Sequence, residues 1–304
     1  MRTEADVDSD GHQAPDDDRR RRPPSRWWRS RAQSEAAHAR ADEDVADDQR
    51  QQLADVGHEL KSPLSIMLAL CTRLEESGRL EAQDAADVAR IRANAYTMLR
   101  RVQDLMLVSR LENAGDRQLE AAIVDVAAIV RTSAEGFAEL AAQRALDLRV
   151  AVPERLPAIA DEEKLVSVVS NLVANAIRHA PAGGVVRCSL SSVPGRLILQ
   201  VADNGPGVAP DQRATIFERY RRGDRSGGTG LGLAIVGEIV ALHGGTVAVA
   251  DAPEGGALFT VELPLRTQRP DVGHGATPQR SLALADRQKA IVEDLRSELR
   301  TAHS

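Results

Sequence analysis

The stretch "NLVANAIRHA", residues 171–180, decides the fold, because it combines a helical apolar pattern with polar residues on one face. Leucine, valine, alanine and isoleucine fill it without proline or glycine, which predicts a buried helix. Asn171 and Asn175 lie four residues apart, so they share one helix face, which Arg178 and His179 continue. Burying two amides without partners is costly. Mg²⁺ accepts amide oxygens together with water and phosphate oxygens, so we expect this face to hold magnesium and a nucleotide.

Two glycine-rich segments follow this helix. "VADNGPGV", residues 201–208, ends a strand pattern at Asp203, whose carboxylate can accept a hydrogen bond from an exocyclic amine. Gly205 and Gly207 would let the backbone approach a base closely. "GGTGLGLAIV", residues 227–236, begins an apolar helix and predicts a phosphate cradle at the helix N-terminus. The cradle residues are Gly228, Thr229, Gly230, Leu231 and Gly232.

Residues 120–265 alternate between two hydrophobic periods. Helical patterns at about 125–142 and 161–179 are interleaved with alternating, β-rich segments. These segments are "LDLRVAV", "VVRCSL", "RLILQVAD", "TVAVAD" and "LFTVELPL". We therefore expect an α/β sandwich, in which helices back one sheet.

Residues 36–115 predict a helical hairpin. Leu53, Leu60, Met67 and Leu74 repeat every seven residues, and Val88, Ala95 and Val102 repeat likewise after the break at "ESGRL". The companion heptad positions are Val56, Pro63 and Leu70 in the first run and Ile91, Met98 and Leu105 in the second. Such positions form the apolar seam of packed helices. One hairpin buries only part of its seam, so we expect a homodimeric four-helix bundle. The predicted fold class is α plus α/β, with the dimeric bundle followed by the sandwich.

"HELKSP", residues 58–63, places a histidine on the outside of this bundle. In the heptad set by Leu53, His58 takes the position farthest from the seam. Glu59 can hold one imidazole nitrogen as N–H and leave the other free to attack. Ser62 lies one turn on, on the same face. Pro63 removes a backbone donor, so we expect the helix to bend there.

These motifs resemble the transmitter region of bacterial two-component sensor histidine kinases over about residues 50–265. "HELKSP" is similar to the phospho-acceptor box, "NLVANA" to the N box, "DNGPGV" and "GGTGLGLAIV" to the two glycine boxes, and "IFERYRR" to the F box. The resemblance implies a dimerisation and phosphotransfer bundle. It also implies a GHKL (Bergerat-type) ATP-binding domain, a fold shared with gyrase, MutL-type repair proteins and heat-shock chaperone ATPases.

The resemblance also implies roles for residues around the acceptor. His58 would accept the γ-phosphoryl group of ATP, and Glu59 would orient or deprotonate it. Arg222 stands where an arginine beside the F box faces the transferring group. Ser62 replaces the threonine or asparagine that positions water for dephosphorylation of the partner. "RYRRGDRSGG", residues 219–228, would form a short lid over the nucleotide.

In the ATP-binding domain, the resemblance assigns the Mg²⁺ to Asn175, with Asn171 in support. Asp203 would read the adenine, and Arg178 stands where the family often has a lysine near the phosphates. The implied function is an ATP-dependent protein-histidine kinase that acts as a homodimer and phosphorylates an aspartate on the receiver domain of a response regulator. Two alternatives stay open: a scaffold that binds nucleotide without transfer, and a serine/threonine kinase of the anti-sigma type.

The remaining features concern location and partners. The net charge of −6 does not indicate nucleic-acid binding, and Cys71 and Cys188 form no CxxC motif, which fits a reducing cytoplasm. No apolar run reaches the roughly 18 residues that a membrane span needs, so we expect a cytoplasmic protein whose signal arrives through its termini or a separate sensor protein.

Two further segments, one at each end of the sequence, lie outside the two expected domains. Residues 1–35 read as a disordered charged tail. Its arginines and tryptophans at 19–31 would make weak membrane-surface contact, or else form a solvated tail. Residues 266–304 read as a linker followed by a helix that packs on the surface, with a docking helix as the alternative.

Overall fold

The computed structural model describes residues 60–78, 80–112, 119–218, 230–266, 288–297 and 299. The chain divides into two compact units, Met1–Gln49 and Arg50–Ser304, and every described residue belongs to the second. The N-terminal tail, the linker after residue 266 and the whole of the expected lid, residues 219–228, lie outside the described residues.

A helix over residues 60–76 and the helix α2, Ala82–Glu112, form a hairpin. Leu64 packs with Ala95, Tyr96 and Leu99 of α2 in one buried cluster. An ion pair between Arg92 Nη1 and Glu75 Oε2, 2.6 Å apart, also joins the two helices. Ser62 and Pro63 are both exposed, and helix 60–76 runs through Pro63.

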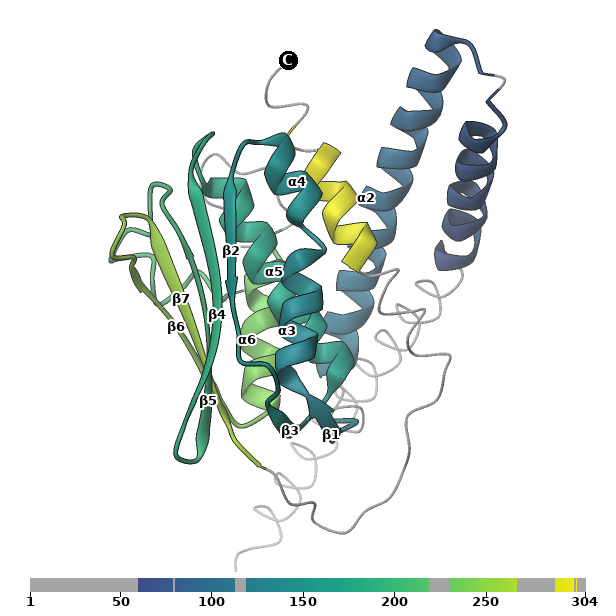
Figure 1. The fold of residues 1–304 in the computed structure, drawn as a ribbon. Coiled ribbons are helices and arrows are strands. Elements are labelled where there is room, and N and C mark those ends of the chain that lie inside the picture. Colours follow the sequence, from purple (N-terminus) through teal and green to yellow (C-terminus); the bar gives the residue numbers. More distant parts are fainter. Residues whose placement is uncertain are drawn as a thin grey trace, which may run out of the picture. The chain divides into compact units, whose positions relative to one another are not determined.

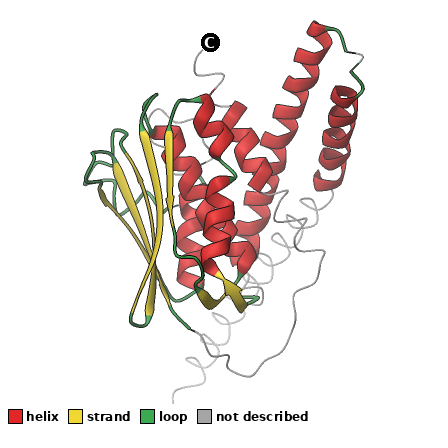
Figure 2. Cartoon of the chain, viewed as in Figure 1, coloured by secondary structure: helices red, strands yellow, loops and turns green. Residues whose placement is uncertain are grey.

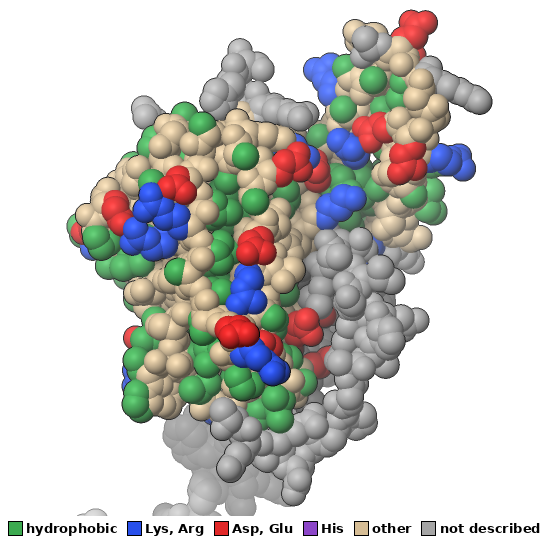
Figure 3. All heavy atoms as spheres, in the orientation of Figure 1, with side chains coloured by type: hydrophobic (Ala, Val, Ile, Leu, Met, Phe, Trp, Pro, Cys, Tyr) green, Lys and Arg blue, Asp and Glu red, His purple; other side chains and the backbone are tan. Residues whose placement is uncertain are grey.

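The expected apolar seam of the hairpin divides into a buried and an exposed part. Val88 and Ala95 are buried and Val102 is partly buried, whereas seven large apolar side chains of the seam remain 37–56% exposed. Figure 3 shows hydrophobic side chains exposed among charged ones on the hairpin. The exposed seam residues are Leu60, Met67, Leu70 and Leu74 on helix 60–76 and Ile91, Met98 and Leu105 on α2.

A five-stranded sheet follows, in the order β2-β4-β5-β7-β6. Strands β2 and β4 pair in parallel, and the other three pairs are antiparallel. The strands are β2 (Asp147–Ala151), β4 (Val185–Val193), β5 (Arg196–Asp203), β6 (Thr246–Asp251) and β7 (Ala257–Pro264). Each contains a segment that the alternating pattern predicts, because every second side chain enters the core.

Helices cover one face of this sheet, so the domain has the two layers expected from the sequence (Figures 1 and 2). They are α3 (Val126–Glu135), α4 (Ala138–Gln143), α5 (Glu162–His179) and α6 (Gly232–Leu242). Their apolar faces and the inner face of the sheet form one core, in which Leu172, Ile177 and Phe259 have no exposed surface. Phe217 of the F box meets the Phe259 ring edge-on, with the ring centroids 6.3 Å apart.

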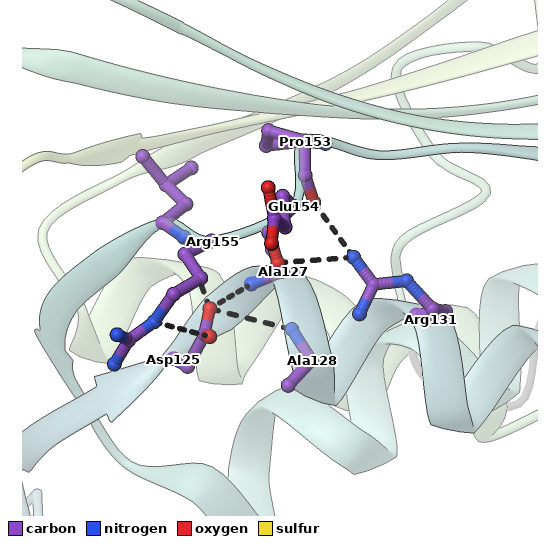
Figure 4. A network of polar contacts seen from close by, with 8 residues as sticks. Asp125, Ala127, Ala128, Arg131, Pro153, Glu154 and Arg155 are labelled. Carbon is purple, nitrogen blue, oxygen red and sulfur yellow. Dashed lines mark hydrogen bonds and ion pairs between the residues drawn. The ribbon is translucent and has the colours of Figure 1, made fainter.

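A two-stranded antiparallel sheet of β1 (Ala122–Asp125) and β3 (Pro157–Ala160) flanks α3, and the sequence pattern does not predict it. Asp125 caps α3 by accepting hydrogen bonds from the backbone N–H groups of Ala127 and Ala128, at 3.2 and 3.4 Å (Figure 4). The same carboxylate oxygen accepts from Leu156 N–H at 3.0 Å, and this bond is the main cause that lowers the pKa of Asp125. One aspartate therefore ties the helix start to the turn before β3.

Arg131 secures the same turn from the helix side. Its Nη2 donates to the carbonyl oxygens of Pro153 and Glu154, at 2.7 and 3.2 Å (Figure 4). The strands themselves pair residues as far apart as Ala122 and Ala160, so a local sequence pattern does not predict them.

Residues 288–297 form a helix, as the sequence predicts, and one face of it is buried. Ala290, Ile291, Asp294 and Leu295 are each at most 2% exposed, whereas Lys289 is exposed. Its apolar residues join clusters in both the hairpin and the α/β domain. No described helix is long and apolar enough to cross a bilayer.

Candidate nucleotide site

The helix α5 supplies the first wall of the site. Asp161 starts it by accepting a hydrogen bond from Lys164 N–H at 3.1 Å, and residues 165–174 are all buried. Asn171 is 4% exposed, and its Nδ2 donates to the carbonyl oxygen of Ser167 at 2.9 Å. Its Oδ1 has no hydrogen-bond partner among the described residues. A buried acceptor left unpaired costs roughly 1–3 kcal/mol, so this oxygen is suited to a ligand.

The start of α6 faces Asn171 from the second glycine box. A Cβ atom on Gly232 would stand 2.8 Å from Asn171 Oδ1, so only glycine fits there without displacing the amide. Gly230 has φ +71°, a backbone conformation that glycine adopts without strain, and Leu231 is buried. The structure thus brings the N box and the end of the second glycine box together, as the sequence predicts.

The end of β5 supplies the third wall. Asp203 is 4% exposed, and its Oδ1 accepts hydrogen bonds from Gly205 N–H at 2.9 Å and Ala257 N–H at 3.4 Å. Burial raises the pKa of Asp203, and the two backbone donors oppose that rise. A Cβ on Gly205 would stand 2.5 Å from the carbonyl oxygen of His179, so the first glycine box packs against the end of α5.

Gly256, in the turn between β6 and β7, completes this corner and is missed by the sequence analysis. It has φ +81°, and a Cβ there would lie 2.6 Å from Gly205 N and 2.8 Å from the Cα of Asn204. Asn204 in turn accepts a hydrogen bond from Val185 N–H at 2.9 Å. The only local signal is the glycine pair in "PEGG", which indicates a turn and not its contact with the Asp203 loop.

The remaining predicted residues divide between described and undescribed parts of the chain. Asn175, Arg178 and His179 are half-buried on α5, where burial and the charge of Arg178 lower the pKa of His179. Gly207 has φ +74° and lies beside Gly256. The predicted site residues that lie outside the described residues are His58, Glu59, Arg222, Gly228 and Thr229.

The donor set suits a hard cation bound together with phosphate. Among the described residues, no group of three or more histidine, cysteine or acidic side chains forms a metal site. Asn171, with its unpaired oxygen, and the half-buried Asn175 instead offer amide oxygens as metal ligands. Mg²⁺ usually takes only a few protein ligands when a substrate phosphate supplies further oxygen ligands.

Two family profiles match the chain. "His Kinase A (phospho-acceptor) domain" matches residues 48–114, and "Histidine kinase-, DNA gyrase B-, and HSP90-like ATPase" matches residues 160–267. The chain belongs to the histidine kinase family. The second profile contains the three walls of the site, so the α/β domain of this histidine kinase is its ATP-binding domain, and the hairpin is its phospho-acceptor domain.

Curated relatives agree with this assignment. This histidine kinase is 40% identical over 220 residues to the sensor histidine kinase TmoS of Ectopseudomonas mendocina. The aligned region covers 70% of this chain and 22% of TmoS. It is 38% identical over 229 residues to the probable sensor histidine kinase TcrY of Mycobacterium tuberculosis, which covers 73% of this chain and 47% of TcrY. The chain thus spans less than half the length of these two relatives.

A solved structure supports the same architecture. The crystal structure of full-length ShkA in complex with AMPPNP has 35% sequence identity and a TM-score of 0.60. The match covers 72% of this histidine kinase and 46% of the ShkA chain. The expected fold class, a helical hairpin followed by an α/β ATP-binding domain, is therefore confirmed.

Proposed function

We propose that this chain is an ATP-dependent protein-histidine kinase that phosphorylates His58 and passes the phosphoryl group to an aspartate on the receiver domain of a response regulator. The observation that carries the proposal is the unpaired, buried Oδ1 of Asn171, which faces the glycine start of α6. A nucleotide with its metal ion would satisfy this oxygen.

The described residues divide the binding of ATP between two ends of the site. Asp203 uses Oδ1 for its two backbone donors, so Oδ2 is the oxygen we assign to the adenine amine. The phosphates would lie at the start of α6, where the residues Gly228, Thr229, Gly230, Leu231 and Gly232 form the cradle. Arg178 and Arg222 would neutralise phosphate charge. Asn175, supported by Asn171, would hold Mg²⁺, which supplies further charge neutralisation when bound.

The transfer step needs little covalent help from the protein. An imidazole nitrogen of His58 forms a bond to the γ-phosphorus while the P–O bond to the β-phosphate breaks and ADP leaves. Glu59 orients the ring and takes up the imidazole proton. In-line positioning and charge neutralisation supply most of the catalysis in phosphoryl transfer, which matches this set of residues.

A second copy of the chain is the partner that we propose for the exposed seam of the hairpin. Seven large apolar side chains of the described hairpin helices, among them Met67, Ile91 and Met98, are 37–56% exposed. They lie at the heptad positions expected to pack in a bundle. A symmetric dimer would bury the seams of both copies against each other. The division into a hairpin at 36–115 and an ATP-binding domain at 120–265 is part of the same proposal.

Labelling with radioactive ATP and Mg²⁺ tests the proposed function. We expect acid-labile, alkali-stable label on the wild-type chain and on His38→Gln, a matched control, and none on His58→Gln. Asn175→Asp should abolish labelling and leave the dimer intact, as measured by light scattering. Acid-stable label would instead identify a serine/threonine kinase, and nucleotide binding without any label would identify a scaffold.

A further inference from the structure

The C-terminal helix, residues 288–297, has one apolar residue in the core of the hairpin and others in the core of the ATP-binding domain. Ala290 has no exposed surface and packs with Leu64, Ala95, Tyr96 and Leu99 of the hairpin. The next residue, Ile291, belongs to the core of the ATP-binding domain together with Leu295. This short helix is therefore shared by both domains.

A buried ion pair fastens the helix to the hairpin. Asp294 Oδ2 lies 2.7 Å from Arg100 Nη1 of α2, and both side chains are at most 5% exposed. Arg100 also pairs with Asp104 one turn along α2, with Nε and Oδ2 3.7 Å apart. A carboxylate in such a place is tolerated only while it is paired, so the contact specifies this arrangement of the helix.

Polar contacts on its other side hold the helix to the ATP-binding domain. Gln288 Nε2 donates to the carbonyl oxygen of Ser133 on α3 at 2.8 Å, and Arg296 Nη2 lies 3.2 Å from Glu139 Oε1 on α4. Gly136, between these two helices, leaves no room for a Cβ beside the Gln288 amide. The helix therefore fits closely on both domains.

The same ion pair reaches the phosphate end of the nucleotide site. Arg100 Nη2 lies 3.9 Å from the point where a Cβ on Gly232 would stand, and Asn171 Oδ1 lies 2.8 Å from that point. The helix α2 is thus held against the start of α6, and Asp294 holds the arginine that faces it.

We propose that the C-terminal helix is an intramolecular clamp that holds the ATP-binding domain against α2 and slows phosphoryl transfer until it is released. This inference rests on the proposed function. Transfer requires the ATP-binding domain to reach the acceptor histidine and then to leave it for the regulator. A helix that belongs to both cores opposes that motion, and the crowded start of α6 restricts the phosphate end of the site in the clamped state.

Hydrogen exchange tests the clamp without any need for kinase activity. Asp294→Ala removes the charge that pairs Arg100, so we expect exchange of the amides in residues 288–297 to rise by about 10- to 100-fold. Ala290→Glu attacks the apolar contact and should have the same effect. The matched control is Glu293→Ala, because Glu293 pairs with Arg296 of its own helix at 2.7 Å. This control should leave the exchange unchanged.

Autophosphorylation by the full chain tests the inhibitory role. If release is the slow event, Asp294→Ala and Ala290→Glu should raise the labelling rate by roughly 10-fold, since more of the protein occupies the released state. Adding His58→Gln to Asp294→Ala should remove the label. If label persists there, the proposed function fails, while the exchange experiment still decides whether the clamp exists.

Three results would overturn the clamp. Unchanged exchange in both variants would mean that the helix does not depend on these contacts. Raised exchange with an unchanged or lower labelling rate would mean that the helix does not inhibit. Unfolding of the ATP-binding domain by both variants, measured by thermal melting, would mean that the helix is a fixed part of the core and cannot be released.

Discussion

Replacing Gly256 by alanine tests the corner that the tertiary structure adds to the adenine end of the site. The new Cβ would stand 2.6 Å from Gly205 N and 2.8 Å from the Cα of Asn204, whereas non-bonded carbon atoms prefer about 3.5–4.0 Å. These neighbours are backbone atoms and cannot rotate away. The loop that carries Asp203 must therefore shift by about 1 Å.

Such a shift misplaces the carboxylate that we assign to the adenine amine. Losing a hydrogen bond to a charged group costs about 1.5–3 kcal/mol, which corresponds to a loss of about 10- to 100-fold in nucleotide affinity. Alanine at φ +81° also costs about 1–2 kcal/mol of stability, because L-residues are strained in that region.

Gly255 provides the matched control. It has φ +85°, and a Cβ there meets no atom within 4 Å. Gly255→Ala should therefore show the same backbone cost of about 1–2 kcal/mol, measured by urea unfolding. It should keep the wild-type affinity for a fluorescent ATP analogue, measured by anisotropy. Equal affinities of the two variants would refute the reasoning, because the two substitutions differ chiefly in the overlap with the Asp203 loop.

Three further predictions concern the helix cap, a buried histidine and the acceptor helix. Asp125→Ala should cost about 1 kcal/mol in urea unfolding through the lost cap of α3, while Asp125→Asn keeps most of it at neutral pH. The lowered pKa of Asp125 means that the added stability of its ionised form is lost as the pH falls below 3.8, so the gap in stability between the wild type and Asp125→Ala should narrow there. His243 Nε2 accepts a hydrogen bond from Asp161 N–H at 3.2 Å, and its Nδ1 lies 2.8 Å from the Ile239 carbonyl oxygen. The buried ring is therefore neutral, and burial is the main cause of its lowered pKa. As the pH falls below 6.5, the ordinary pKa of histidine, the unfolded chain protonates His243 and the folded chain does not. The free energy of unfolding should therefore fall by up to about 1.4 kcal/mol per pH unit, and His243→Gln should show a weaker dependence of stability on pH. Pro63→Ala should alter labelling or transfer if the proline serves as a hinge; unchanged rates for both would exclude that role.

The sequence alone predicts most of the elements, because their signals are local. The alternation in "RLILQVAD" predicts β5, Arg196–Asp203, to the residue, and the spacing of Asn171 and Asn175 places both on α5. The motifs also mark Gly205 and Gly232, and in the structure these glycines allow close packing within the protein, since a Cβ would meet the His179 carbonyl oxygen at 205 and Asn171 Oδ1 at 232.

Contacts between distant segments could not be predicted in this way. Gly256 lies more than fifty residues from Asp203, and the short strands β1 and β3 carry no clear alternation. The apolar face of helix 288–297 predicts burial against something, but not that Ala290 and Ile291 enter different cores. Periodicity states which face of an element is apolar, whereas the partner of that face depends on how the whole chain packs. The motifs therefore predict the elements that carry the candidate nucleotide site, whereas the corner at Gly256 and the contact of Asp294 with Arg100 appear only in the tertiary structure.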